Sequence, residues 1–173
     1  SMLAGDVGID VKTARSYTDL LVDLLLIRRL PAWHANVGKR LAKSPKIYLR
    51  NSGVLQALLG LGDMDTLLSH PVIGSSWEGF AIENLLRALP RGLEPFYYRT
   101  SGGAEIDLLL AFPDGRKWAV EIKRSLTPRP EKGFYSACED IKPDAQYIVY
   151  PGDERYQIRP GIEVISLYEL MNT

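Results

Sequence analysis

The feature that most constrains this chain is a pair of apolar segments separated by a Pro-Asp-Gly turn. The segments cover residues 104–112 and 116–123, and the turn is Pro113–Gly115. Proline presets φ for a turn and glycine accepts a positive φ, so this tripeptide favours a tight reversal between two strands. We therefore expect an antiparallel hairpin in which Phe112 pairs with Arg116.

This register places polar side chains opposite one another. Counting back from the turn, Asp107 lies opposite Glu121, and Glu105 lies opposite Lys123. Because side chains alternate along a strand, these four side chains should share one face of the hairpin. The other face should be wholly apolar, formed by Ile106, Leu108, Leu110, Trp118, Val120 and Ile122.

Two carboxylates at this spacing need a compensating charge. Directly opposed residues have Cβ atoms about 4.5–5.5 Å apart. At ~5 Å and an effective dielectric constant of ~20, the repulsion between Asp107 and Glu121 is roughly 3 kcal/mol. A divalent cation would reverse the sign of this energy, and carboxylate oxygens suit Mg²⁺ or Mn²⁺. Lys123 would then orient a water molecule or stabilise charge on a phosphate. The alternative is a solvated strand face on which Glu105 and Lys123 form an ion pair.

A helix before the hairpin supplies a further acid. Ser76 can cap a helix over residues 77–89. Glu78 lies on the apolar side of this helix, so its carboxylate needs a partner, and a metal shared with the hairpin acids would provide one. Glu83 should instead form an ordinary exposed ion pair with Arg87, four residues further on.

The rest of the second half predicts a small mixed sheet with flanking helices. Further strands are expected at 95–99, 146–150 and 162–165, and further helices at 131–141 and 167–171. A strand, a crossover helix and a second strand imply a parallel pairing added to the antiparallel hairpin. The fold class is therefore α/β.

The first half resembles part of a winged helix. Asp10 can cap a helix that runs to about Leu26, and short strands at 27–30 and 46–49 bracket a basic loop. Helix, strand, loop and strand form the latter part of a winged helix, and too few residues precede Asp10 for a complete one. We place the partial winged helix and basic linker at residues 1–60, and a second domain at residues 61–173.

The basic residues are segregated although the chain is neutral overall. There are 21 basic and 21 acidic residues, but no acidic residue lies between Asp23 and Asp63. A one-signed segment of this kind can meet a phosphate backbone. The alternative is that the segment docks on the acidic remainder of the chain. The candidate phosphate contacts are Arg28, Arg29, Lys39, Arg40, Lys43 and Lys46.

Composition narrows the cellular setting. The single Cys138 excludes an internal disulfide framework and is typical of a reducing compartment, so we expect a cytoplasmic protein. No stretch approaches the ~18 apolar residues of a membrane span, so no membrane partner is expected.

The motifs together resemble a known superfamily. Residues 74–78, 98–107 and 119–125 are similar to the motifs of the PD-(D/E)XK nucleases, whose fold is restriction-endonuclease-like. More narrowly, the chain resembles the uncharacterised C-terminal region of bacterial and archaeal AAA-type ATPases. In those proteins a nucleotide-binding domain and a winged helix come first. Residues 30–40 and 43–48 are similar to the linker of that family.

The resemblance implies a metal-dependent DNA phosphodiesterase. It implies that Asp107, Glu121 and Glu78 hold Mg²⁺ or Mn²⁺ and that Lys123 is the catalytic lysine, with DNA as the partner. No G-x-x-x-x-G-K-[ST] motif occurs, so no ATP binding is expected by that route, although a separate ATPase or a second copy remains a possible partner. The alternative is a non-catalytic module of the same fold that binds DNA or protein.

Overall fold

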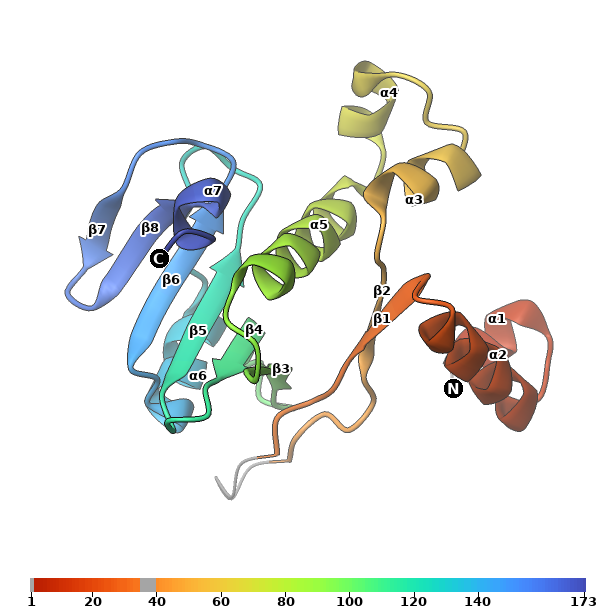
Figure 1. Cartoon of the computed structure of the whole chain (residues 1–173), viewed down its shortest axis with the longest axis horizontal. Coiled ribbons are helices and arrows are strands. Elements are labelled where there is room, and N and C mark those ends of the chain that lie inside the picture. The colour runs from red at the N-terminus through yellow and green to blue at the C-terminus, as the bar shows by residue number, and fades with distance from the viewer. Residues whose placement is uncertain (1, 35–39) are drawn as a thin grey trace.

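The first half of the chain forms four short helices around a small hairpin. The computed structural model describes residues 2–34 and 40–173. Asp10 caps the second helix as predicted, because its Oδ1 accepts hydrogen bonds from the backbone N–H groups of Lys12 and Thr13 at 2.9 and 3.0 Å. The elements, shown from red to yellow in Figure 1, are α1 (Met2–Val7), α2 (Val11–Asp23), β1 (Ile27–Leu30), β2 (Lys46–Leu49), α3 (Ser52–Leu58) and α4 (Met64–Ser69).

The helices of this half bury few side chains. In α2 only Ala14 is buried, in α3 none is, and in α4 only Leu67 is. The apolar face that the sequence predicts for α2 is present but uncovered, with Tyr17 60% and Leu20 51% exposed. The helices α1, α3 and α4 were not predicted.

The β1–β2 hairpin joins this half to the rest of the molecule. The two strands pair antiparallel, from Ile27 opposite Leu49 to Leu30 opposite Lys46, as the order of elements predicted. Leu30 and Ala32 belong to the same buried cluster as the main sheet, and Ala32 forms a bridge with Tyr97. The hairpin is therefore anchored in the main core.

The second half is a mixed six-stranded sheet with helices on both faces. Strand order is β3-β4-β5-β6-β8-β7, with β5, β6 and β8 parallel to one another and the other pairs antiparallel. The strand β7 was not predicted. The elements are α5 (Ile73–Ala88), β3 (Glu94–Arg99), β4 (Glu105–Ala111), β5 (Lys117–Ile122), α6 (Lys132–Ile141), β6 (Ala145–Tyr150), β7 (Tyr156–Arg159), β8 (Ile162–Ser166) and α7 (Leu167–Leu170).

Each face of the sheet is covered by different helices. The helices α5 and α7 pack on one face through side chains such as Ile82, Leu85 and Leu170, and α6 packs on the other through Phe134 and Ala137. Figure 1 shows α7 in front of the sheet and α6 behind it. In the described part of the chain, no helix is long and apolar enough to cross a membrane.

The start of α5 differs from the prediction. The helix begins at Ile73, after Val72, which makes no side-chain capping hydrogen bond. Ser76 lies inside the helix and is buried, so it does not cap it. The extra turn adds residues 73–76 before Trp77, whose indole Nε1 donates a hydrogen bond to the Lys123 carbonyl at 3.1 Å. This contact fixes the first turns of α5 beside the end of β5.

The register of the β4–β5 hairpin is confirmed. Leu108 pairs with Val120 and Ala111 with Lys117, and the backbone N–H of Phe112 donates to the Arg116 carbonyl at 2.8 Å. The Pro-Asp-Gly turn therefore has the predicted length, and the pairing of the two strands ends at Leu108 and Val120, one residue before Asp107 and Glu121.

The predicted apolar face is interrupted by a bulge on the other edge of β4. Phe96 pairs with Leu109 but Tyr98 pairs with Ile106, so two residues of β4 oppose the single Tyr97 of β3. A bulge of this kind changes which face the following side chains use. Ile106 accordingly packs with Leu109 under α6, and not with Leu108 as the strict alternation had predicted.

Candidate functional site

The structure brings the predicted acids and Lys123 into one polar pocket. The pocket has a volume of about 300 Å³ and is open between α5, the ends of β4 and β5, and the start of α6. Among described residues its lining includes five carboxylates and three lysines. They are Glu78, Glu105, Asp107, Glu121 and Glu131, with Lys46, Lys123 and Lys132.

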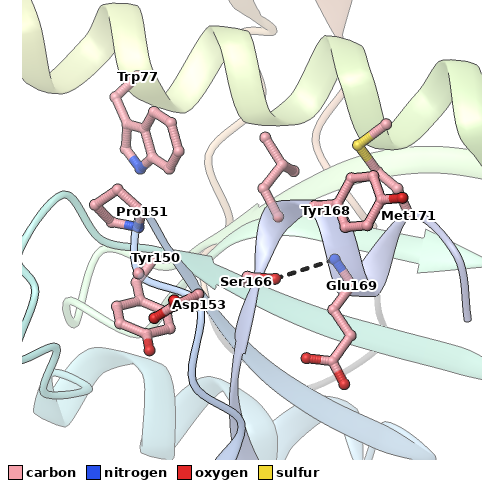
Figure 2. A pocket seen from close by; sticks show the side chains of 10 residues that line it. Trp77, Tyr150, Pro151, Asp153, Ser166, Tyr168, Glu169 and Met171 are labelled. Carbon is pink, nitrogen blue, oxygen red and sulfur yellow. Dashed lines mark hydrogen bonds between the residues drawn. The ribbon is translucent and has the colours of Figure 1, made fainter.

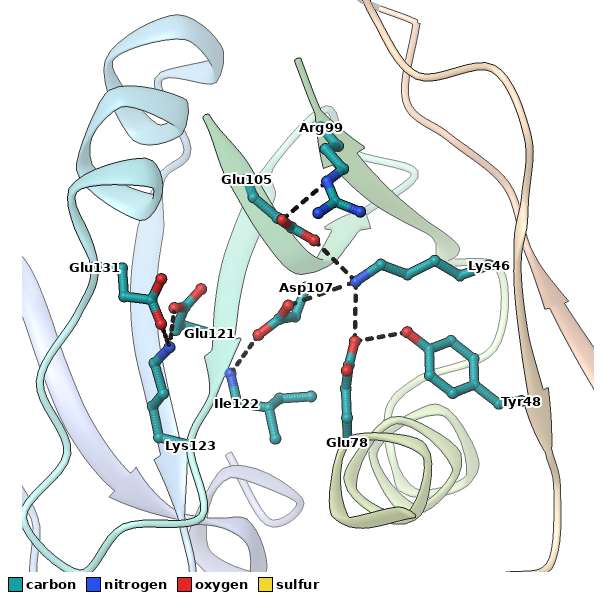
Figure 3. Close-up of polar contacts among 10 residues, drawn as sticks. All are labelled: Lys46, Tyr48, Glu78, Arg99, Glu105, Asp107, Glu121, Ile122, Lys123 and Glu131. Atoms are coloured by element: carbon teal, nitrogen blue, oxygen red, sulfur yellow. Dashed lines mark hydrogen bonds and ion pairs between the residues drawn. The ribbon is translucent and has the colours of Figure 1, made fainter. Parts of the chain in front are cut away.

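Three elements position the four predicted site residues. Asp107 is in the bulge of β4, Glu121 is in β5 and Lys123 follows it, while Glu78 points in from the second turn of α5 (Figure 3). The Oδ2 atom of Asp107 accepts a hydrogen bond from the backbone N–H of Ile122 at 2.9 Å. This bond fixes one carboxylate against the neighbouring strand.

Burial gives the two hairpin acids unusual proton affinities. Burial, together with the nearby Glu78 charge, raises the pKa of Asp107 to about 6. Burial and the nearby Asp107 charge raise the pKa of Glu121 to about 7. A further positive charge beside these carboxylates would lower both pKa values and favour the ionised forms.

Lys123 has acidic partners other than the predicted one. Its Nζ lies 2.8 Å from Glu121 and 2.5 Å from Glu131, which is the residue that precedes α6. Burial alone would lower the pKa of Lys123, but the hydrogen bonds to these carboxylates raise it. Glu105 instead pairs with Lys46 and with Arg99, at 3.2 and 3.1 Å, so the alternative Glu105–Lys123 pair does not form.

The sequence did not indicate that Lys46 enters this pocket. Its Nζ lies 3.0 Å from Glu78, 3.2 Å from Glu105 and 3.6 Å from Asp107. Tyr48, two residues further along β2, donates its hydroxyl to Glu78 at 2.6 Å. The i, i+2 spacing places Lys46 and Tyr48 on one side of a strand, but nothing in their local sequence identifies the acids that they meet.

Some side chains of the basic segment form ion pairs with acids of the same chain, and others are exposed to solvent. Arg28 and Arg50 both pair with Glu83, at 2.7 Å each, and Arg29 pairs with Asp19 at 2.5 Å. With Lys46 in the acidic pocket, this geometry favours the docking alternative for these basic side chains. Arg40 and Lys43 are exposed, and Lys39 lies outside the described residues.

Glu83 is the clearest departure from its predicted setting. The predicted ion pair with Arg87 forms at 3.1 Å, but Glu83 is only 4% exposed and also pairs with Arg28 and Arg50. Burial alone would raise the pKa of Glu83, yet the hydrogen bonds from Arg28 and Arg50 lower it. Glu83 thus attaches the β1–β2 hairpin to α5.

The donor set of the polar pocket fits a hard divalent cation. Two carboxylates with raised pKa values, on adjacent strands, supply the oxygen ligands that Mg²⁺ and Mn²⁺ prefer. Counting the five acids as ionised and the three lysines as charged, the lining carries a net charge of about −2, which one such ion would neutralise. Among the described residues, no group of at least three His, Cys, Asp or Glu side chains is already arranged to hold a metal ion.

A second pocket is lined in part by Trp77. Its volume is about 830 Å³, and aromatic and apolar side chains such as Tyr150, Tyr168 and Met171 line it (Figure 2). One of its acids, Glu169, pairs with Arg155 at 3.2 Å, and none of its described lining residues is a lysine. The paired acids and lysine that hydrolytic chemistry needs are therefore in the smaller, polar pocket.

Two protein-family models match this chain. The family model "Domain of unknown function (DUF4143)" matches residues 73–170, and "Domain of unknown function (DUF8612)" matches residues 1–65. No solved structure matches the chain significantly.

Two curated mycobacterial proteins are similar over nearly the whole chain. They are the uncharacterized protein Rv2008c of Mycobacterium tuberculosis and the uncharacterized protein Mb2031c of Mycobacterium bovis, each 40% identical over 172 residues. The alignment covers 99% of this chain but only 38% of each relative. Domains described as DUF4143 are found in the C-terminal region of AAA-type ATPases. With its model matching more than half of the residues, the chain belongs to the DUF4143 family.

Proposed function

We propose that this chain is a metal-dependent phosphodiesterase domain that acts on DNA, with a restriction-endonuclease-like fold preceded by part of a winged helix. The observation that carries the proposal is the convergence of Asp107, Glu121, Lys123 and Glu78 from three separate elements on one polar pocket. A mixed sheet with helices on both faces is compatible with that fold.

The residues would share the work in the following way. Asp107 and Glu121 would hold Mg²⁺ or Mn²⁺, while Glu78, which the sequence predicts as a further ligand, is already engaged by Lys46 and Tyr48. When bound, such an ion supplies Lewis-acid activation of a phosphate oxygen and lowers the pKa of a bound water. The Lys123 ammonium, held in place by Glu121 and Glu131, would stabilise the negative charge that develops on the phosphate.

One observation favours the alternative of a non-catalytic binding module. Each of the five pocket carboxylates is already ion-paired with Lys46 or Lys123. Acids that are paired with lysines of the same chain can form a structural network that supports a binding surface. Exposed Arg40 and Lys43 would then contact phosphate without any reaction.

Metal binding and plasmid nicking separate the two functions. We expect wild type to bind Mn²⁺ in calorimetry and to nick supercoiled plasmid only when Mg²⁺ or Mn²⁺ is present. Asp107→Asn should lose both properties, while Asp153→Asn, an exposed change of equal charge, should keep them. A wild type that binds Mn²⁺ and DNA without cutting would establish the binding module and exclude the phosphodiesterase.

A further inference from the structure

Lys46 has a position that no motif of the second half requires. It belongs to β2, which is distant in sequence from the hairpin acids. Its ammonium nevertheless lies among three carboxylates of α5 and β4 (Figure 3). The Lys46 side chain is 22% exposed, so these interactions are only partly screened by water. In this position the Lys46 ammonium offsets part of the negative charge of the three carboxylates.

The strand that carries Lys46 is held firmly. The neighbouring β1 is anchored by Leu30, which is fully buried in the main core. The Tyr97 hydroxyl donates to the Ser44 carbonyl, and the Lys46 ammonium lies 5.4 Å from the centre of the Tyr97 ring. A Cβ atom added at Gly79 would lie only 3.2 Å from the Tyr48 ring, so β2 and α5 approach closely. The pocket therefore includes Lys46 as a fixed member.

From these contacts we infer that Lys46 is a specificity-determining residue that limits both how tightly the pocket binds a divalent ion and how many such ions it holds. Lys46 holds Glu78 and Glu105 at 3.0 and 3.2 Å, and Tyr48 also holds Glu78, whereas Asp107 is the most distant of the three acids from Lys46, at 3.6 Å. A metal would therefore bind on the Asp107–Glu121 side. Without the Lys46 charge, the net charge of the lining changes from about −2 to about −3, and Glu78 becomes available as a ligand. The inference rests on the proposed function, because it concerns the same pocket.

Calorimetry with Mn²⁺ alone tests this role without any nuclease assay. We expect wild type to bind one ion per chain, and Lys46→Met to bind Mn²⁺ at least tenfold more tightly or to bind a second ion. Lys46→Arg should behave as wild type. Lys43→Met, which removes an exposed lysine from the same segment, should change the affinity less than twofold. If Lys46→Met has the same or a lower Mn²⁺ affinity and the same stoichiometry, the inference is wrong.

A second pair of variants covers the case in which Lys46→Met does not fold. If Lys46 holds Glu78 away from the metal, Glu78→Gln should weaken Mn²⁺ binding at most tenfold, whereas Asp107→Asn should abolish it. Equal loss in both variants would make Glu78 a direct ligand and overturn the inference.

The outcomes also separate this inference from the proposed function. Equal, tight binding by wild type and Lys46→Met would leave the phosphodiesterase proposal intact and remove only the role of Lys46. Binding by Lys46→Met but not by wild type would support the role of Lys46 and exclude a metal-dependent activity of the natural chain. Absence of Mn²⁺ binding by both proteins would overturn both.

Discussion

Replacing Asp107 by asparagine should stabilise the metal-free protein at neutral pH. Burial and the Glu78 charge raise the pKa of Asp107 from its ordinary 3.8 to about 6, so the folded state binds this proton more tightly than the unfolded state does. The free energy of unfolding of the metal-free wild type should therefore fall as pH rises from about 4 through about 6. Asparagine keeps an oxygen that can accept the Ile122 hydrogen bond but carries no charge.

The size of the effect follows from the pKa difference. One pKa unit corresponds to about 1.4 kcal/mol, so ionised Asp107 costs the fold about 3 kcal/mol at pH 7.5. The penalty shrinks to below about 1 kcal/mol at pH 4, which is close to the ordinary pKa of an aspartate. We expect Asp107→Asn to gain most of this energy at pH 7.5 and little at pH 4.

Urea unfolding in EDTA, followed at several pH values between 4 and 7.5, measures this difference. The control is Asp153→Asn, which makes the same charge change at an exposed position. Addition of Mn²⁺ at a hundredfold excess over its Kd should then raise the free energy of unfolding of wild type by about 2.7 kcal/mol and leave Asp107→Asn unchanged. The variant would be the more stable protein without metal and would lose its advantage with metal.

Two results would refute this reasoning. One is a metal-free Asp107→Asn that is less stable than wild type at pH 7.5, because Asp107 would then be held by Lys46 at a net gain. The other is a wild-type stability that rises between pH 5 and pH 7, because the folded state would then bind fewer protons than the unfolded state.

Further changes test other parts of the structure. Lys123→Ala should reduce any metal-dependent plasmid nicking by a factor of roughly 10² while changing Mn²⁺ affinity little, since a lysine is not a ligand; full activity in the variant would exclude a catalytic role. Glu83→Gln leaves partly buried arginines without their acid, so urea unfolding should show a loss of about 3 kcal/mol, against almost none for the exposed Glu94→Gln. If Arg40 and Lys43 contact phosphates, replacing both by Ala should reduce the log–log salt slope of duplex binding by about 2, and an unchanged slope would remove them from the interface.

Local chemistry accounts for the features that were predicted correctly. The Pro-Asp-Gly turn determines the register of the β4–β5 hairpin within a few residues, from Ala111 opposite Lys117 to Leu108 opposite Val120. The Asp10 cap of α2 likewise needs only atoms two and three residues away. Such interactions can be read from the sequence because the chain supplies both partners at a short, fixed separation.

Tertiary structure decided what each charged side chain meets. Lys46 contacts Glu78, 32 residues away in sequence, and Arg28 contacts Glu83, 55 residues away. Part of the basic segment that could contact a phosphate backbone is therefore ion-paired with acids of the same chain. The bulge in β4 is set by pairing with β3, and it moves Ile106 to the α6 side of the sheet. The physical reason is that the sequence shows which side chains require an opposite charge or burial, whereas the packing of elements distant in sequence decides which residues become their partners.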